Sequence, residues 1–199
     1  FPTRRSSDLQ VAILIWGCVF CAIAALCIFL SSNYDREKRR YLILMESFAS
    51  LLLLMDAMAH IFSGYPGVPG SVMVCISSFL VFFLSDVFPL CFHIYVCVYL
   101  FSKKERRTLK RVKTGYVIAA AGAAFVVISQ FTHWYYYIDG DNCYHRASLY
   151  IMSILLPAAG LLIDLTLLLQ YKKRVSRKLL FSMLSCVVLP AVAAAVQAF

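Results

Sequence analysis

The sequence predicts an all-α protein, a polytopic transmembrane helical bundle with five complete spans and a sixth that is cut short at the C-terminus. Of its 199 residues, 62% are hydrophobic and 15% are charged. Apolar stretches of about 20 residues, long enough for a helix to cross the hydrocarbon of a bilayer, follow one another along the chain. Sixteen of the 19 Lys and Arg residues lie between them, in segments 32–40, 102–113 and 171–178. Because Lys and Arg are retained on the cytoplasmic side, we expect a multi-pass plasma-membrane protein with these three segments in the cytoplasm.

The expected spans follow from where the apolar stretches begin and end. We place them at 10–31, 41–62, 71–101, 114–132, 147–170 and 179–199. The third is too long for one upright span, because its residues at 1.5 Å each give roughly 46 Å of helix. We therefore expect it to tilt and to bend at Pro89, which cannot join the helical hydrogen bonds. In the fourth span, Gly115, Ala119 and Ala123 recur every four residues, a spacing that lets another helix approach closely.

Two loops, 63–70 and 133–146, are expected on the outer side, where Arg146 is the one Lys or Arg residue. The first is rich in Gly and Pro and is typical of a turn. The second opens with Trp134 and three tyrosines, an aromatic belt typical of the membrane interface. Its segment 139–142 resembles a calcium loop but lacks the required glycine position and the distal glutamate, so we expect a turn.

Both ends of the chain indicate a partial sequence. Residues 1–9 resemble the translation of a sequencing-library adapter, and we expect them to be non-native, with a short basic tail as the alternative. Residues 10–199 form the expected transmembrane domain, which stops inside an apolar stretch. We therefore expect a longer parent protein whose natural N-terminus is external.

Composition and motifs exclude several classes of protein. The net charge of +9 describes loops that face anionic lipid headgroups, rather than a nucleic-acid groove. Seven of the eight cysteines lie in apolar spans, where a free thiol behaves as a small hydrophobic group, and Cys143 stands alone in an outer loop. Cys18 and Cys21 have CxxC spacing but no second ligand pair, so no metal site is expected. No nucleophile elbow, P-loop, dinucleotide fingerprint or zincin motif occurs, so we predict no catalytic residue and no cofactor.

Six ionisable side chains lie within the expected spans, where each is costly and calls for a reason. They are Glu46, Asp56, His60, Asp86, His93 and Asp164. Asp56 and His60 are four residues apart, and Asp86 and His93 are seven apart, so each pair shares a helix face. Since no Lys or Arg lies in any span, the acids pair with histidine, hydroxyl groups or water, or stay protonated. Three interpretations stay open: hydrogen bonds between helices, a pocket for a ligand or ion entered from outside, and a path for protons or cations.

The outer loop 133–146 is a second candidate site. Trp134 and Tyr136 offer aromatic faces on which a ligand can stack, and they equally suit the anchoring of helix ends among the lipid headgroups. The expected ligand-binding or sensing residues are therefore Asp56, His60, Asp86, His93, Trp134, Tyr136 and Asp164.

Six segments also carry a family pattern. They are residues 35–44, 54–64, 76–84, 92–95, 137–146 and 189–197. Together they resemble the N-terminal membrane sensor module of bacterial signalling proteins, notably those of anaerobic Firmicutes. In such proteins about seven helices precede a cytoplasmic output domain, commonly a GGDEF-type diguanylate cyclase and sometimes a histidine kinase. The resemblance implies signal reception for this chain, catalysis in a following domain, and a homodimer formed through that domain.

We therefore expect a receptor-like membrane module. A stimulus at the outer half would repack the helices around Pro89, Pro157 and Pro190 and change the helix that enters the output domain. The alternative is a small transporter or proton-coupled carrier that uses the Asp, Glu and His side chains within its spans. A purely structural membrane subunit is the third hypothesis.

Overall fold

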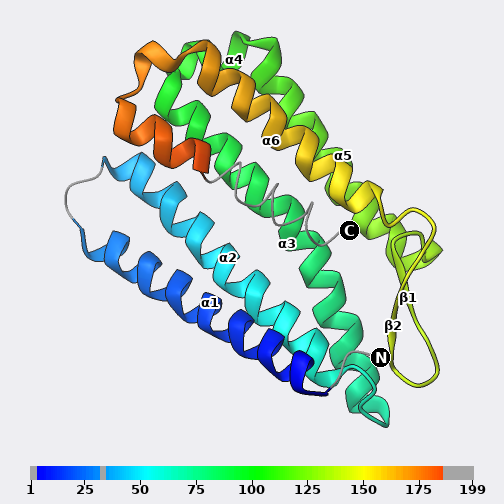
Figure 1. The fold of residues 1–199 in the computed structure, drawn as a ribbon. Coiled ribbons are helices and arrows are strands. Elements are labelled where there is room, and N and C mark those ends of the chain that lie inside the picture. The colour runs from blue at the N-terminus through cyan, green and yellow to red at the C-terminus, as the bar shows by residue number, and fades with distance from the viewer. Residues whose placement is uncertain (1–3, 32–34, 186–199) are drawn as a thin grey trace.

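The computed structural model is an all-α helical bundle and describes residues 4–31 and 35–185 (Figure 1). Among these residues, five helices are long and apolar enough to cross a membrane. They are α1 (Arg4–Leu30), α2 (Arg36–Phe62), α3 (Val68–Leu100), α5 (Lys110–Thr132) and α6 (Met152–Gln170). The expected fold class, with its five complete spans, is confirmed.

Helix α3 is central, and the rest of the bundle packs on it in two groups (Figure 1). Helix α1 packs on α2 and α2 packs on α3, so we call α1 and α2 the N-terminal half. Helices α5 and α6 contact α3 and each other, and we call α3, α5 and α6 the C-terminal half. Because α3 has 33 residues, it is about 50 Å long and reaches both ends of the bundle. It continues through Pro89 as one helix, as expected.

The three basic segments gather at one end of the bundle, which we call the basic end (Figure 1). We expected a plain loop at 102–113, but Lys103–Thr108 form the short helix α4. A capping box explains this helix: Ser102 Oγ accepts a hydrogen bond from the Glu105 N–H, and the Glu105 carboxylate accepts one from the Ser102 N–H. After α6, Lys172–Arg174 form a 3-10 turn, η1.

Ionic contacts tie the basic end together across both halves. Arg174 donates to the carbonyl of Leu100, the last residue of α3, at 3.1 Å and to the Glu105 carboxylate at 3.0 Å. Arg106 pairs with Glu37 of α2 at 3.3 Å. The backbone N–H of Ser102, followed by the Arg174 guanidinium, holds the pKa of Glu105 below its usual range. The basic end is therefore held by specific contacts as well as being rich in positive charge.

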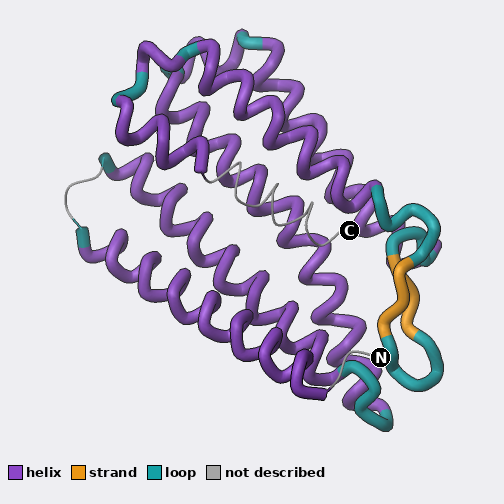
Figure 2. The backbone as a smooth tube through the Cα atoms, in the orientation of Figure 1, coloured by secondary structure: helices purple, strands orange, loops and turns teal. Residues whose placement is uncertain are grey.

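A β-hairpin lies at the opposite end, which we call the hairpin end (Figure 2). Strands β1 (Tyr136–Ile138) and β2 (Tyr144–Arg146) pair antiparallel, with Tyr137 opposite His145. The expected outer loop with its aromatic belt was incomplete here, because both strands were missed. The turn expected at 139–142 is confirmed: Asp139 Oδ1 accepts hydrogen bonds from the N–H groups of Asp141 and Cys143.

The tip of this β-hairpin docks on the loop between α2 and α3. The Asn142 side-chain amide donates to the carbonyls of Tyr65 at 2.9 Å and Gly67 at 3.3 Å. In return, the Gly64 N–H donates to the Asn142 carbonyl at 3.0 Å. Asn142 has a φ of 60°, in the left-handed region that Asn tolerates better than most residues. The segment after α5 is therefore tied to the loop before α3, which closes the hairpin end across both halves.

Several helix boundaries differ from prediction because polar residues join the helix ends. Helix α2 begins at Arg36 rather than at 41, and α5 begins at Lys110 rather than at 114, since basic side chains form their first turns. Helix α6 begins at Met152 rather than at 147, because the preceding residues complete the β-hairpin connection, where the Ala147 N–H donates to the Tyr135 carbonyl at 3.0 Å.

The outermost boundaries also shift. Helix α1 begins at Arg4 rather than at 10, so helical structure extends into the segment expected to be non-native, and α3 covers Val68–Leu100 rather than 71–101. Residues 177–185 are helical, and they include the first part of the expected sixth span, 179–199. The rest of that span lies outside the described residues.

Candidate functional site

A buried histidine–aspartate pair joins α3 to α6. His93 Nδ1 lies 2.6 Å from Asp164 Oδ1, and the two residues are 3% and 0% exposed. On the other side of the ring, His93 Nε2 lies 3.0 Å from the carbonyl oxygen of Val112 in α5. His93 therefore contacts both other helices of the C-terminal half. The expectation that buried acids pair with histidine is confirmed for Asp164.

Hydrogen-bond chemistry assigns the protons of this pair. The Val112 carbonyl can only accept, so His93 Nε2 carries a hydrogen. A 2.6 Å contact at Nδ1 then requires a second hydrogen between Nδ1 and Asp164 Oδ1, since two facing lone pairs repel. Written as imidazolium with carboxylate, or as imidazole with carboxylic acid, the pair has no net charge, which suits an apolar interior. Loss of that one hydrogen would leave an uncompensated charge and break the link between α3 and α6.

Two glycines of α5 make room for the polar side chains of α3. A Cβ at Gly115 would lie 2.5 Å from His93 Nε2, and one at Gly122 would lie 2.6 Å from Asp86 Oδ1. Any larger residue at either position must therefore displace a side chain or separate α3 from α5. Tyr116 completes this wall, with its ring edge-on to the imidazole and centroids 5.1 Å apart. The close approach expected from the small residues of this span is confirmed at Gly115.

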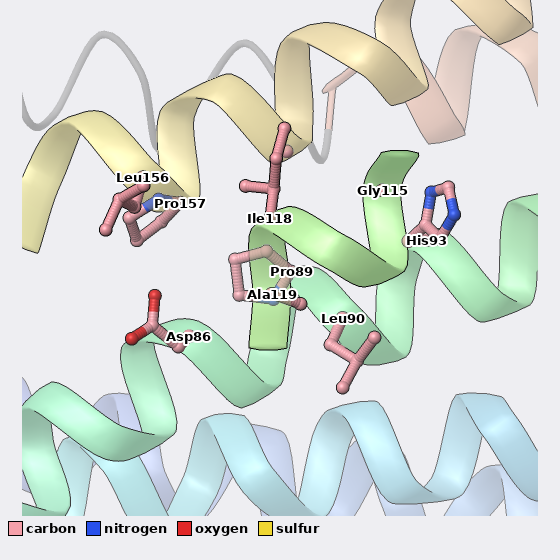
Figure 3. Close-up of a pocket in the computed structure, with 10 residues that line it drawn as sticks. Asp86, Pro89, Leu90, His93, Gly115, Ile118, Ala119, Leu156 and Pro157 are labelled. Carbon is pink, nitrogen blue, oxygen red and sulfur yellow. The ribbon is translucent and has the colours of Figure 1, made fainter. Parts of the chain in front are cut away.

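A small cavity lies between Asp86 and His93 (Figure 3). Its volume is about 20 Å³, enough for one water molecule. In Figure 3 the Asp86 carboxyl points from α3 toward Pro157 of α6. Pro89 and Pro157 both line the cavity, and neither has an N–H, so each leaves a helical carbonyl free to bind a polar group. The shared face expected for Asp86 and His93 is confirmed, because both line this cavity.

Two buried oxygen atoms have no hydrogen-bond partner among the described residues. They are Asp164 Oδ2 and the Tyr135 hydroxyl. Burial, and after it the charge of Asp86, raises the pKa of Tyr135 to about 12, which keeps the phenol protonated and able to donate. Buried polar atoms without partners are rare in proteins, because their desolvation is not compensated. These atoms therefore mark positions suited to water or to a polar ligand.

Asp56 and His60 lie on α2, apart from this site. Asp56 Oδ1 is 3.8 Å from His60 Nε2, so their expected shared face is confirmed, but the two side chains are 39% and 40% exposed. His60 also contacts Gln10 of α1, with Nε2 atoms 3.1 Å apart. Glu46, a further acid of α2, lies against Cys21 of α1. Asp56, His60 and Glu46 therefore make their described contacts within the N-terminal half and do not join the buried pair.

A larger hollow lies at the hairpin end, between the first turns of α3, the last turn of α5 and strand β1. Its volume is about 230 Å³. The residues around it are Ser71, Cys75, Ser129, Gln130, His133, Tyr136, Tyr137, Ile138 and Asp139. Tyr136, one of the two expected aromatic site residues, faces this hollow and stacks on Phe82 and Tyr144. The other, Trp134, packs near Phe125 with ring centroids 6.4 Å apart.

Within the part of the chain that the structure describes, no group of three His, Cys, Asp or Glu side chains is placed to hold a metal ion. The CxxC cysteines serve helix packing instead. Cys18 Sγ lies 3.3 Å from Ser50 Oγ of α2, and Ser50 donates to the Cys18 carbonyl at 3.0 Å. These contacts join α1 to α2.

Sequence reasoning missed the partner of His93 and the part played by α5. Spacing along one helix places Asp86 and His93 on one face, but it does not say which helix that face meets. The available signal was Gly115 and Gly122, seven residues apart and hence on one face of α5. No protein-family model, no curated protein and no solved structure matches the chain. Its function is therefore argued from the site itself.

Proposed function

We propose that the chain is the signal-reception module of a bacterial membrane signalling protein, in which a stimulus at the hairpin end changes how α3 packs against α6. The observation that carries this proposal is the buried His93–Asp164 pair. A receptor needs two packings with different affinity for its stimulus. One shared hydrogen distinguishes a linked from an unlinked arrangement of these helices, so the pair is a suitable two-state element.

Helix α3 supplies the connection between the two ends. Its first turns border the hollow at the hairpin end, through Ser71 and Cys75. Its last carbonyl, that of Leu100, accepts a hydrogen bond from Arg174 in the segment that follows α6. A shift of α3 against α6 would therefore move the segment that leads on from the bundle. By resemblance, a diguanylate cyclase domain, or next a histidine kinase domain, follows and responds to that movement.

The proposed orientation puts the basic end in the cytoplasm of a plasma-membrane protein, where it meets anionic headgroups. Thr108 and Gly140 are exposed at the basic end and the hairpin end respectively. In chains without native cysteines, a membrane-impermeant thiol reagent added to intact cells should modify Gly140→Cys and spare Thr108→Cys. The reverse pattern would invert the orientation.

The reception role is tested by the coding sequence that follows Phe199 and by the activity it encodes. We expect a soluble output domain, and we expect Asp164→Asn in the full-length protein to change the basal output. Asp56→Asn is the matched control, because it neutralises an acid of the N-terminal half and should leave that output unaltered. A gene that ends within a few further helices would rule out this role.

A proton-coupled carrier is the second candidate, and the cavity between Asp86 and His93 favours it. One water there could hydrogen-bond to Asp86 beside the His93 ring, and Asp164, the partner of His93, has an oxygen, Oδ2, without a described partner. In proteoliposomes, Asp86→Asn should then abolish proton-coupled flux. Flux that is unchanged in this variant would remove the carrier from consideration.

A further inference from the structure

We propose that the hollow at the hairpin end binds a small organic ammonium ion that also carries an oxygen atom, either free in solution or as part of a lipid headgroup. The site deepens the proposed function by naming a class of stimulus. The claim that ligand binding changes an output rests on the proposed function, whereas the binding itself does not. Its volume of about 230 Å³ is below the range typical of drug-sized ligands. An amino alcohol or a single headgroup is the size of ligand that it suits.

Asp139 gives the hollow its charge. Hydrogen bonds from the Cys143 N–H first, and from the His145 side chain next, hold the pKa of Asp139 below its usual range, so the carboxylate is ionised at neutral pH. Among the described residues that line the hollow there is no Lys or Arg. Arg146 lies nearby in sequence, but its guanidinium sits over the Tyr150 ring, 4.6 Å from the centroid. Apart from the His145 ring, which hydrogen-bonds to the Asp139 carboxylate, no described cationic side chain contacts this charge. A concave site with such a carboxylate attracts cations.

The carboxylate also keeps room for a ligand. Asp139 Oδ1 already accepts from two backbone N–H groups, whereas Oδ2 accepts one bond, from His145 Nε2 at 2.7 Å. A carboxylate oxygen accepts two hydrogen bonds, so Oδ2 retains one position for an N–H of a primary ammonium such as ethanolamine. A quaternary ammonium such as choline has no N–H, and the charge of the carboxylate attracts it instead. Tyr137 beside it is 45% exposed. One face of its ring stacks on His145, with centroids 5.1 Å apart, so the opposite face is the one that can attract a cation.

The side of the hollow formed by α5, which we call the α5 wall, offers a donor for the ligand's oxygen. Ser129 is 2% exposed, and its Oγ accepts a hydrogen bond from the Tyr135 N–H at 2.9 Å. No described acceptor takes the Ser129 hydroxyl hydrogen, which leaves it available to an oxygen atom of the ligand. The last carbonyls of α5 lie on this wall as well, and the C-terminal end of a helix favours positive charge. A cation with a neighbouring oxygen therefore matches both Asp139 and the α5 wall.

Cys75 lines the hollow and provides a reporter for the test. The full chain is purified in detergent with its other cysteines replaced, and the rate at which a charged methanethiosulfonate modifies Cys75 is measured at pH 8. Choline and ethanolamine should slow this modification in a saturable way. The neutral isostere 3,3-dimethylbutan-1-ol should not slow it, since it lacks the charge. A chain that keeps only Cys143, outside the lining, is the matched control and should be unaffected by any of these compounds.

Three variants locate the effect. Asp139→Asn keeps the Oδ1 acceptor but removes the charge, so we expect about tenfold weaker protection by choline. Asp141→Asn removes a charge two residues away, outside the lining, and choline should protect Cys75 in this variant as well as it does in the parent. Ser71→Trp fills the hollow and should abolish protection. The proposal would be overturned if the neutral isostere protected Cys75 as well as choline does, or if choline protected Asp139→Asn as well as the parent. It would also be overturned if neither choline nor ethanolamine protected Cys75.

The two sources of the ligand are separated in nanodiscs. If a lipid headgroup occupies the site, Cys75 should be protected in phosphatidylethanolamine without added amine and become reactive in phosphatidylglycerol. If the natural ligand is free, both lipids should leave Cys75 reactive until choline or ethanolamine is added. This experiment measures binding alone. If the chain binds choline or ethanolamine but controls no output, the proposed site stands and the proposed reception role is wrong.

Discussion

The two halves of the bundle hold the same pair of side chains in opposite settings. In the N-terminal half, Asp56 and His60 are 3.8 Å apart on one helix, and their side chains are more than a third exposed. In the C-terminal half, His93 and Asp164 are 2.6 Å apart on two helices and almost wholly enclosed. Enclosure thus turns an ordinary polar contact into a link between helices, because a buried charge depends on its partner far more than an exposed one.

Close helix approach produces this enclosure. Gly115 and Gly122 of α5 allow the polar side chains of α3 to lie against the α5 backbone. In the N-terminal half, no residue of α1 from 8 to 30 is buried, and the described buried residues of α2 are Met45 and Ala57, so its polar pair is left partly exposed. The comparison predicts that substitutions in the C-terminal half are far more costly than chemically identical ones in the N-terminal half.

The largest difference is expected between Asp164→Ala and Asp56→Ala. Removing Asp164 leaves His93 without its buried partner in an apolar site and should lower the free energy of unfolding by about 3–5 kcal/mol. Removing Asp56 breaks a half-exposed pair and should lower it by less than about 1 kcal/mol. Reversible unfolding in detergent micelles, followed by helical circular dichroism, measures both losses. Equal losses would show that enclosure does not distinguish the two pairs.

Glycine substitutions give the next largest contrast. Gly115→Ala places a methyl group against the His93 ring, and the resulting overpacking should lower the free energy of unfolding by about 1–3 kcal/mol. Gly160→Ala is the control in the same half, because a Cβ there meets nothing within 4 Å. Its gain in helix propensity should leave stability equal to the parent's or raise it by up to about 1 kcal/mol. The same micelle unfolding experiment compares them, and a tolerated Gly115→Ala would contradict the close approach.

The contact that joins the halves at the hairpin end should matter less. Asn142→Ala removes two hydrogen bonds to the loop between α2 and α3, worth about 1–2 kcal/mol together. Hydrogen exchange at the Gly64 amide, which donates to the Asn142 carbonyl, should accelerate in this variant. Asp141→Ala is the neighbouring control, since the bond it makes through its own N–H does not need its side chain. Unchanged exchange at Gly64 would mean that the tip is held by other contacts.

The smallest effect is a pH dependence confined to the β-hairpin. The pKa of Asp139 is lowered in the folded state, so its contribution to stability is present above the ordinary carboxyl pKa of about 4. That contribution is lost as pH falls through the lower, folded-state value, because protonation weakens the bonds from Cys143 and His145. The protection of the strand β2 amides, corrected for the intrinsic pH dependence of exchange, should therefore fall below pH 4 in the parent and not in Asp139→Asn. A loss of protection of equal size in the variant would assign the transition to another group.

The sequence alone predicts the membrane spans and the polar pairs within a helix, but not the pairing between helices. Charge segregation and apolar length identify all five described spans, and residue spacing places Asp86 with His93. The choice of Asp164 as the partner of His93 depends on how α3, α5 and α6 meet, and no local pattern encodes that. The β-hairpin escaped prediction for a related reason, since three-residue strands are too short to show an alternating pattern.

The state of the His93 ring tests the central claim most directly, namely that one shared hydrogen joins α3 to α6. In the full chain labelled with ¹⁵N-histidine, the His93 resonances are assigned from the spectrum of His93→Gln and compared with those of Asp164→Ala. We predict a hydrogen on Nε2 and a strongly hydrogen-bonded hydrogen at Nδ1, with the Nδ1 signal altered when Asp164 is removed. A ring without a hydrogen on Nε2, or a spectrum that Asp164→Ala leaves unchanged, would contradict the account.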